Sequence, residues 1–426
     1  MKHSLHAACV GIVLIFLLHL GGCGKELVCL EDLFPDSGTA APDSPEEPPE
    51  TTDRWQPLPD YDASIPRAKA LTGAEPFVET AHCIVFADSR ESVRLKYINK
   101  ATGEVRVLCG DPLCDHKNDT CAARCDTFTG ATLTYVPQTG RLYFARPRGT
   151  SFLGGYDIVS VGIDEMELTL RVHVRMKPGD TVNSMNHSGG KLYYTHYTLG
   201  GGGSGESDTR TKTTLEELSL SDDKTRTAAS AENMGTFVWD GVVYYRDPLY
   251  ILHACDTASG IHTELCAEEP GADWWFYGGH FLRHAGTRWT MLDLAGNELR
   301  ELWRHEDIPY GMWTVENEET TYSLAYDPYD IERIVYARDP ATGLKKPTPE
   351  TITNVSGGKL LCWTGGMPEV IADLGERTVI GKYSVIGGVV FIKAVAYDDE
   401  GESQNRYCYS VAGKVYELPI GGSEGD

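Results

Sequence analysis

Five potential metal ligands gather in one short stretch of the chain. They are Cys109, Cys114, His116, Cys121 and Cys125, with the spacing C-x4-C-x-H-x4-C-x3-C. Tetrahedral Zn²⁺ takes four Cys or His ligands, and short spacings bring such ligands together at little cost in loop entropy. The first four residues of this set could therefore form a closed, structural zinc site.

The same cysteines could instead form disulfides. The chain carries an export signal, described below, and exported thiols often oxidise. Of the 12 cysteines, an even number remains without Cys9 and Cys23. Cysteines 109, 114, 121 and 125 allow three pairings, between which the spacing does not choose. A redox-active iron–sulfur or haem site is the third alternative, although the sequence contains no C-x-x-C-H motif and no ferredoxin spacing.

The first 22 residues are typical of a targeting segment. Lys2 precedes an apolar run over residues 7–20, which is too short to span a bilayer comfortably. The run ends in Leu20-Gly21-Gly22-Cys23, which resembles the lipobox of bacterial lipoproteins. The resemblance implies a signal peptide over residues 1–22 and a lipid such as palmitate on Cys23. Such a lipid would hold the body at the extracytoplasmic face of the cell membrane. The alternatives are a cleaved signal without lipid and an uncleaved anchor helix.

Residues 23–70 are predicted to form a disordered, acidic, proline-rich tether. The whole chain has 62 acidic and 38 basic residues, a net charge of -24. Binding to phosphate backbones needs clustered Lys and Arg, and this composition therefore argues against nucleic acid as a partner. The membrane, reached through the N-terminal lipid, is the expected partner of the tether.

Short strand-like runs that follow a glycine recur through residues 71–420. Several end in two aromatic residues, and they alternate with turns that run from Asn or Asp to Gly. The clearest strand copies start at Gly140, Gly190, Gly241, Gly358 and Gly388, and the clearest turns span 99–103, 256–260 and 339–343. The units centre near residues 80, 130, 185, 235, 275, 315, 355 and 385, a period of about 40 to 45 residues.

This period predicts an all-β fold, a β-propeller of seven four-stranded blades. Eight blades are the alternative, because residues 351–376 could form a thin blade of their own, and a pair of β-sandwiches is a second alternative. Residues 421–426 are predicted to be a tail. The best helical candidate is the short segment 214–220, and the glycine-rich segment 199–206 is predicted to be a surface loop within a blade.

The stretch Cys109-x-x-Pro112-x-Cys114-x-His116-x4-Cys121 resembles a motif of uncharacterised surface lipoproteins of gut clostridia. Those proteins carry a propeller-like body with this arrangement early in it. The resemblance covers the lipobox, the cluster and the general repeat. It implies an exported, membrane-anchored propeller and supplies no activity. More loosely, the repeats look like those of TolB-like and quinoprotein-like propellers.

No catalytic motif stands out. The sequence lacks H-E-x-x-H and G-x-S-x-G. Tyr326 and Tyr329, around a predicted loop at 327–330, are the best candidates for contact with a ligand, whereas the tryptophans are expected to pack between blades. The function expected is a non-enzymatic module that binds a protein, peptide or glycan. The alternatives are a propeller hydrolase, lyase or quinone-dependent oxidoreductase, and a sensory or structural subunit of an envelope assembly.

Overall fold

The computed structural model describes most of the chain beyond residue 54. The described ranges are 55–71, 75–89, 94–116, 120–125, 132–148, 155–175, 181–198, 212–232, 234, 236–247, 251–266, 272–305, 310–338, 345–375, 378–397 and 403–418. The chain divides into two compact units, Met1–Pro45 and Glu46–Asp426, and every described residue belongs to the second. Within the described ranges, none of the helices has the length and hydropathy that a membrane span requires.

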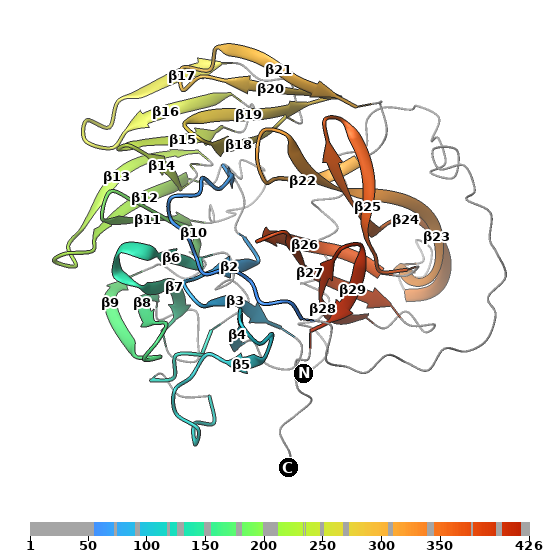
Figure 1. The fold of residues 1–426 in the computed structure, drawn as a ribbon, viewed down its shortest axis with the longest axis horizontal. Helices are drawn as coiled ribbons and strands as arrows, with labels where there is room; N and C mark the ends of the chain where they lie inside the picture. The colour runs from blue at the N-terminus through green and yellow to red at the C-terminus, as the bar shows by residue number, and fades with distance from the viewer. Residues whose placement is uncertain are drawn as a thin grey trace. The chain divides into compact units, whose positions relative to one another are not determined.

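The second unit contains seven antiparallel sheets, each built from four strands that follow one another in the sequence. In Figure 1 the sheets surround a common centre as the blades of a propeller. The first three blades are β2 (Phe77–Glu79), β3 (Cys83–Asp88), β4 (Arg94–Asn99), β5 (Val105–Val107); β6 (Thr134–Val136), β7 (Arg141–Pro147), β8 (Tyr156–Gly162), β9 (Leu168–Val174); and β10 (Thr181–Ser188), β11 (Lys191–Thr198), β12 (Lys212–Ser219), β13 (Thr225–Glu232).

The fourth to seventh blades are β14 (Phe237–Trp239), β15 (Val242–Arg246), β16 (Leu252–Asp256), β17 (His262–Cys266); β18 (Asp273–Tyr277), β19 (His280–Ala285), β20 (Arg288–Leu292), β21 (Glu298–Arg304); β22 (Tyr310–Val315), β23 (Thr320–Arg338), β24 (Lys345–Thr364), β25 (Met367–Asp373); and β26 (Thr378–Ile386), β27 (Val389–Tyr397), β28 (Ser403–Val411), β29 (Lys414–Glu417). A 3₁₀ turn, η4 (Pro137–Thr139), joins β6 to β7. The predicted seven blades are confirmed. The candidate eighth unit near residue 355 lies in β24 of the sixth blade.

The turn between the third and fourth strands of a blade is stabilised by residues within the turn itself. Asp256 Oδ1 accepts hydrogen bonds from the backbone N–H groups of Ala258, at 3.0 Å, and Ser259, at 2.7 Å. Gly260 then adopts φ +70°, which closes the hairpin. The corresponding turn of every blade contains one or two residues with positive φ, and the last of these in each turn is Gly103, Met166, Asp223, Gly260, Gly296, Gly366 and Gly413. The copy predicted at 339–343 lies outside the described residues.

The hydrophobic core lies between the blades rather than within them. One cluster joins Val85 of the first blade to Phe144 of the second. Another joins Phe86 of the first blade to Phe391 and Tyr407 of the seventh. A four-stranded sheet cannot bury both faces by itself, so each blade buries its faces against its neighbours. The last blade packs on the first through this second cluster, and among the described strands none of one sheet belongs to the other.

Residues 55–71, called the N-terminal strap from here on, pack against the blades. The Trp55 ring lies 5.1 Å from the ring of Tyr409 in the seventh blade. The backbone N–H of Tyr61 donates to the carbonyl of Ala81, in the β2–β3 turn of the first blade, at 3.1 Å. The packed part of the chain therefore begins before residue 71, the boundary that the proline-rich composition suggested. A composition rich in proline favours an extended chain, and an extended chain can be disordered or, as here, packed along the blades.

The strap ends inside the ring. Strand β1 (Lys69–Ala70) pairs antiparallel with β18, with Lys69 opposite Phe276. The N–H of Leu71 extends the ladder to the carbonyl of Trp274 at 3.1 Å. Because β18 is the first and innermost strand of the fifth blade, β1 lies on its channel side (Figure 1). The strap thus connects the first and seventh blades to the inner strand of the fifth blade.

One local prediction, the loop at 327–330, is wrong, and the best helical candidate, for which the sequence showed no convincing helical periodicity, is not a helix. Segment 214–220 is not helical but belongs almost entirely to β12, where its residues pair with β11 on one side and β13 on the other. Segment 327–330 is not a loop but part of β23, whose hairpin with β24 continues to the pair Arg338 and Lys345. Cross-strand pairing decided both cases, and a local pattern does not reveal it. The predicted loop at 199–206 lies outside the described residues.

Candidate metal centre

The cysteine–histidine cluster lies in the connection between β5 of the first blade and β6 of the second. Asp111 Oδ1 accepts a hydrogen bond from the N–H of Leu113 at 2.9 Å, and the Asp111 carbonyl accepts one from the N–H of Cys114 at 3.2 Å. This tight turn folds Cys114 back toward Cys109. His116 has φ +58°, a left-handed conformation that reverses the chain again. Two consecutive reversals therefore hold the first three ligands together.

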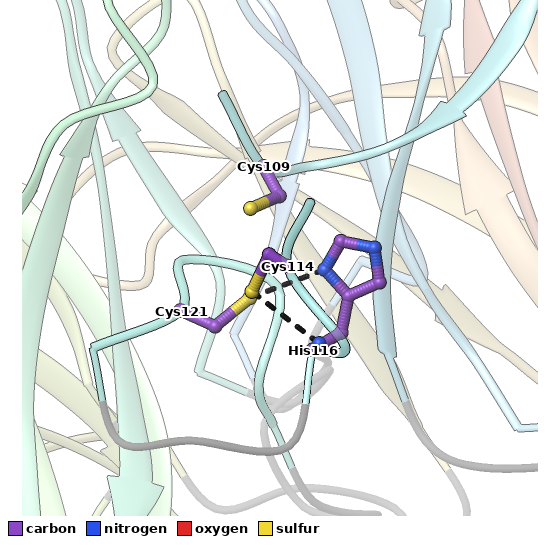
Figure 2. Close-up of side chains that lie close together, drawn as sticks. All are labelled: Cys109, Cys114, His116 and Cys121. Carbon is purple, nitrogen blue, oxygen red and sulfur yellow. Dashed lines mark hydrogen bonds between the residues drawn. The ribbon is translucent and has the colours of Figure 1, made fainter. Parts of the chain in front are cut away.

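The structure brings the four predicted ligands together. The donor atoms of Cys109, Cys114, His116 and Cys121 all lie within 4.8 Å of one another, as Figure 2 shows. In a tetrahedral site with Zn–S bonds of about 2.3 Å, neighbouring donors are about 3.8 Å apart. The cluster needs to contract by only about 1 Å to meet that geometry. A Cys3His cluster of this kind could bind a metal ion such as zinc.

Hydrogen bonds to sulfur and nitrogen orient the ligands. The backbone N–H of His116 donates to Cys114 Sγ at 3.3 Å, and that of Ala123 donates to Cys121 Sγ at 3.4 Å. His116 Nδ1 lies 3.4 Å from Cys121 Sγ. Burial raises the pKa of the Cys121 thiol to about 12. A cation bound among these sulfurs would reverse that preference, because metal coordination stabilises the thiolate.

Among the described residues, free thiols are carried by Cys83, Cys109, Cys121, Cys255, Cys362 and Cys408. Cys125 is not among the four residues whose donor atoms converge. It is half-buried and packs against the hydrophobic cluster between the first and second blades. Cys255 is buried with a free thiol and stands opposite His262 in the ladder.

The second half of the cluster is attached to two blades. The Ala123 carbonyl accepts a hydrogen bond from the N–H of Leu95 in the first blade at 2.9 Å. The Cys121 carbonyl accepts one from Nη1 of Arg146 in the second blade at 3.2 Å. Ala122 and Ala123 are both buried. A metal held at Cys121 would therefore stabilise the junction between these blades.

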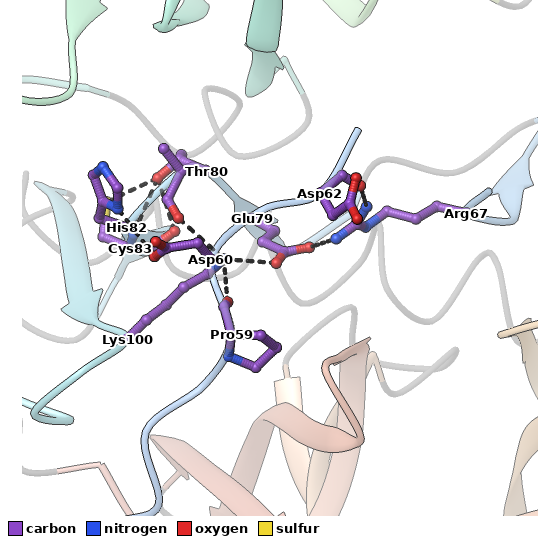
Figure 3. Close-up of polar contacts among 10 residues, drawn as sticks. Pro59, Asp60, Asp62, Arg67, Glu79, Thr80, His82, Cys83 and Lys100 are labelled. Atoms are coloured by element: carbon purple, nitrogen blue, oxygen red, sulfur yellow. Dashed lines mark hydrogen bonds and ion pairs between the residues drawn. The ribbon is translucent and has the colours of Figure 1, made fainter. Parts of the chain in front are cut away.

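A second group of polar residues, which the sequence did not reveal, holds the strap (Figure 3). Glu79 accepts hydrogen bonds from Lys100 Nζ at 2.7 Å and from Arg67 Nη2 at 2.5 Å. Lys100 Nζ also donates to the carbonyl of Pro59 at 3.1 Å. Lys100 is only 1% exposed, although it lies in an Asn-to-Gly turn, where a lysine would be expected in solvent. The strap residues cover it, and only the tertiary structure shows this.

The aromatic residues behave as the sequence predicted in most cases. Trp274, Trp275, Phe276 and Trp313 are buried, so they pack between blades. Trp239 is the exception, because it is 44% exposed at the β14–β15 turn. Tyr326 and Tyr329 lie in the strand β23, and their proposed contact with a ligand stays a prediction.

Fold and cluster define the class of this molecule: it is a seven-bladed β-propeller with a cysteine–histidine cluster between its first two blades. No family description and no curated protein matches the sequence. Among solved structures, an oligogalacturonate lyase from Vibrio parahaemolyticus is similar at 9% identity and a TM-score of 0.48, covering 84% of this chain and 97% of that chain. An oligogalacturonate lyase in complex with manganese is similar at 10% identity and a TM-score of 0.49, with the same coverage.

The β-propeller domain of the Trilobed protease from Pyrococcus furiosus, described as having an open velcro topology, is similar at 10% identity and a TM-score of 0.45. It is covered to 95%, and this chain to 83%. At this level of identity the three likenesses concern the fold alone.

Proposed function

We propose that this protein is an exported, lipid-anchored β-propeller that binds another protein, a peptide or a glycan and catalyses no reaction itself. The observation that carries this proposal is the position of the strap. Propeller enzymes build their sites at the central channel, from loops of several blades. Here β1 pairs with the inner strand β18, so the chain's own backbone takes up part of that space. Binding is then expected on an outer face.

The anchor is proposed from the sequence. Cys23 of the Leu20-Gly21-Gly22-Cys23 motif would carry the lipid, and residues 24–54 would separate it from the strap. A single lipid chain gives only marginal membrane binding, and lipoprotein-type modification with several chains gives a stable anchor. The net charge of -24 keeps such a body soluble and disfavours nucleic acid as its partner.

The metal proposed for the cluster is Zn²⁺, held by Cys109, Cys114, His116 and Cys121. Four protein ligands close a tetrahedral site and leave no position for water, so the role of the metal is structural. Its contribution would be to fix the connection between the first and second blades, through the hydrogen bond from Arg146 to the Cys121 carbonyl.

Membrane fractionation of the expressing cells tests the anchor. The Cys23→Ala protein should move from the membrane fraction to the soluble fraction of the extracytoplasmic space. Cys9→Ala is the matched control, because this cysteine lies within the apolar run of the signal, and its substitution should leave the protein on the membrane. Cys23→Ala protein that stays membrane-bound after a carbonate wash would contradict the proposal.

A further inference from the structure

A groove at the outer edge of the fifth and sixth blades has the features of a peptide-binding site. Its cavity of about 300 Å³ is lined on one side by Arg300, Leu302 and Trp303 of β21. On the other side lie Glu318 and Glu319 of the β22–β23 turn and Thr364 at the end of β24. We call it the blade 5–6 groove. It lies far along the chain from the metal ligands and from the strap.

One wall of the groove is a sheet edge. The order of the fifth blade ends with β21, whose one partner among the described strands is β20. An edge strand presents backbone N–H and C=O groups that an added strand can bind. Residues 298–301 of β21 are exposed. Three residues of this edge strand, Arg300, Leu302 and Trp303, therefore border the cavity.

Two exposed apolar residues are close in the chain to residues that line the groove. Leu299, next to Arg300, is 51% exposed, and Met367 at the start of β25 is 74% exposed. In four other blades the residue that follows the turn's positive-φ residue is charged and exposed: Glu104, Glu167, Lys224 and Lys414. In the fourth and sixth blades it is Ile261 and Met367, both exposed. Ile261 belongs to another blade, whereas Leu299 and Met367 belong to the two blades that form the groove. Exposed aliphatic surface of this kind commonly marks an interaction site.

The charges at the groove favour a cationic partner. Glu318 is paired with Arg300, and Glu298 and Glu301 are paired with Arg288. Glu319 is exposed, and its carboxylate forms no ion pair with the residues that the structure describes. With an overall charge of -24, the chain also attracts positive segments at long range.

We propose that the blade 5–6 groove binds an extended peptide segment of a partner protein, in which basic and aliphatic side chains alternate. The segment adds to β21 as a further strand. Side chains of an extended strand alternate between two sides, so its aliphatic residues contact Leu299 and Met367 while a Lys or Arg on the other side approaches Glu319. This inference rests on the proposed function as a binding module, and it names the partner class and the surface.

The indole of Trp303 allows binding in the groove to be observed by fluorescence. Trp303 lines the groove and is stacked on Trp363 and Trp289, with ring centroids 6.0 Å and 5.4 Å away. A peptide that enters the groove changes the solvent contact of this indole. Its binding is therefore observable as a change of tryptophan fluorescence, independent of any label on the peptide.

The test uses the full chain and a hexapeptide of alternating Lys and Val as the probe. Saturable binding is expected by tryptophan fluorescence and by anisotropy of the labelled peptide. A Lys-Pro hexapeptide keeps the charge but lacks half of the backbone N–H groups, and a Glu-Val hexapeptide reverses the charge. Both should bind at least about tenfold more weakly, a difference of about 1.4 kcal/mol.

Surface variants then locate the site. Glu319→Gln and Met367→Ser should each weaken binding of the Lys-Val peptide by about tenfold. Ile261→Ser, at the matching position of the fourth blade, should leave it unchanged. Any of three results overturns the inference. The Lys-Pro peptide binds as tightly as the Lys-Val peptide, Ile261→Ser weakens binding as much as Met367→Ser, or the Lys-Val peptide shows no saturable binding. If the groove does not bind the peptide although Cys23→Ala releases the protein from the membrane, the proposed anchor still stands. The two proposals therefore fail separately.

Discussion

The indole N–H of Trp55 donates to the carbonyl of Lys100 at 3.0 Å, and this bond joins the beginning of the strap to a blade turn 45 residues later. The Trp55 ring covers Gly103 in the same turn so closely that a Cβ on Gly103 would lie 2.5 Å from it. The strap therefore packs closely against the propeller. Its removal should reduce the free energy of unfolding.

A pair of glycine substitutions tests this contact. Gly103 and Gly260 have nearly the same φ, +72° and +70°, but a Cβ on Gly260 meets nothing within 4 Å. Gly260→Ala should reduce the free energy of unfolding by about 1–2 kcal/mol, the cost of a left-handed alanine. Gly103→Ala should cost about 1–3 kcal/mol more, because it also overpacks the Trp55 ring.

Denaturant unfolding measures both variants. In the Trp55→Ala background the two substitutions should become equal, because the clash is gone. Equal costs in the wild-type background would show that Trp55 does not pack on this turn.

Substitution of Lys100 should be costly for a different reason. Lys100→Met leaves the Glu79 carboxylate, whose side chain is 9% exposed, with Arg67 as its remaining ion-pair partner. Removing one member of a buried ion pair costs about 3–5 kcal/mol. Lys191→Met is the control, since the Lys191 side chain is 40% exposed beside Glu217 and should contribute about 1 kcal/mol or less. Thermal unfolding compares the two, and equal shifts would contradict the burial of Lys100 beneath the strap.

Metal analysis should find about one Zn²⁺ per chain in protein purified without oxygen. Cys121→Ser should abolish this content and lower the melting temperature, because the sulfur belongs to the segment that bridges two blades. Cys125→Ser should keep the metal, since Cys125 lies outside the converging set. A metal-free wild-type protein with fewer free thiols than cysteines would instead support disulfides.

Acid should destabilise the fold through buried histidines. Burial lowers the pKa of His284 to about 3, and the nearby His305 contributes further. Burial and Lys69 lower the pKa of His187 to about 4. In the unfolded chain these two histidines take up a proton below about pH 6.5. In the folded chain they take it up only near pH 4 for His187 and pH 3 for His284. The stabilisation is therefore complete above pH 6.5 and is lost as the pH falls from 6.5 toward 4 and 3.

Each buried histidine should contribute about 1.4 kcal/mol per pH unit to this slope within its window. Denaturant unfolding between pH 8 and pH 4.5 measures it. His284→Gln should flatten the slope relative to the wild type, whatever its effect on stability at pH 8. His82→Gln is the control, because the His82 side chain is 60% exposed. Parallel slopes for wild type and His284→Gln would contradict the prediction.

The glycine-rich segment 199–206 should be dispensable. Thr198 and Lys212 stand directly opposite each other at the ends of β11 and β12, so a two-residue turn can connect them. Replacing residues 199–211 by Asn-Gly should change the melting temperature by no more than a few degrees. A loss of the cooperative transition would mean that this segment contributes to the core of the third blade.

Much of the architecture was readable in the sequence because its determinants are local. The Asp256–Gly260 turn bonds to its own backbone, and the run from Val242 to Tyr245 alternates toward two neighbouring blades. The four metal ligands were also readable, since their spacing brings them together with short turns. The strand at 214–220 was misread because its pairing with β11 and β13 outweighs any local helical tendency.

The sequence alone determined the repeating blade unit, most of its turns and the composition of the cysteine–histidine cluster, because each depends on residues a few positions apart. The choice of seven blades over eight came from the pairing of β24 within the sixth blade. Only the tertiary structure decided where the N-terminal strap goes, that Lys100 is buried, and that a groove opens beside β21. These depend on contacts such as Lys69 with Phe276, which are made by segments far apart in the chain. No local pattern encodes them, since the energy of such contacts arises only after the blades have closed into a ring.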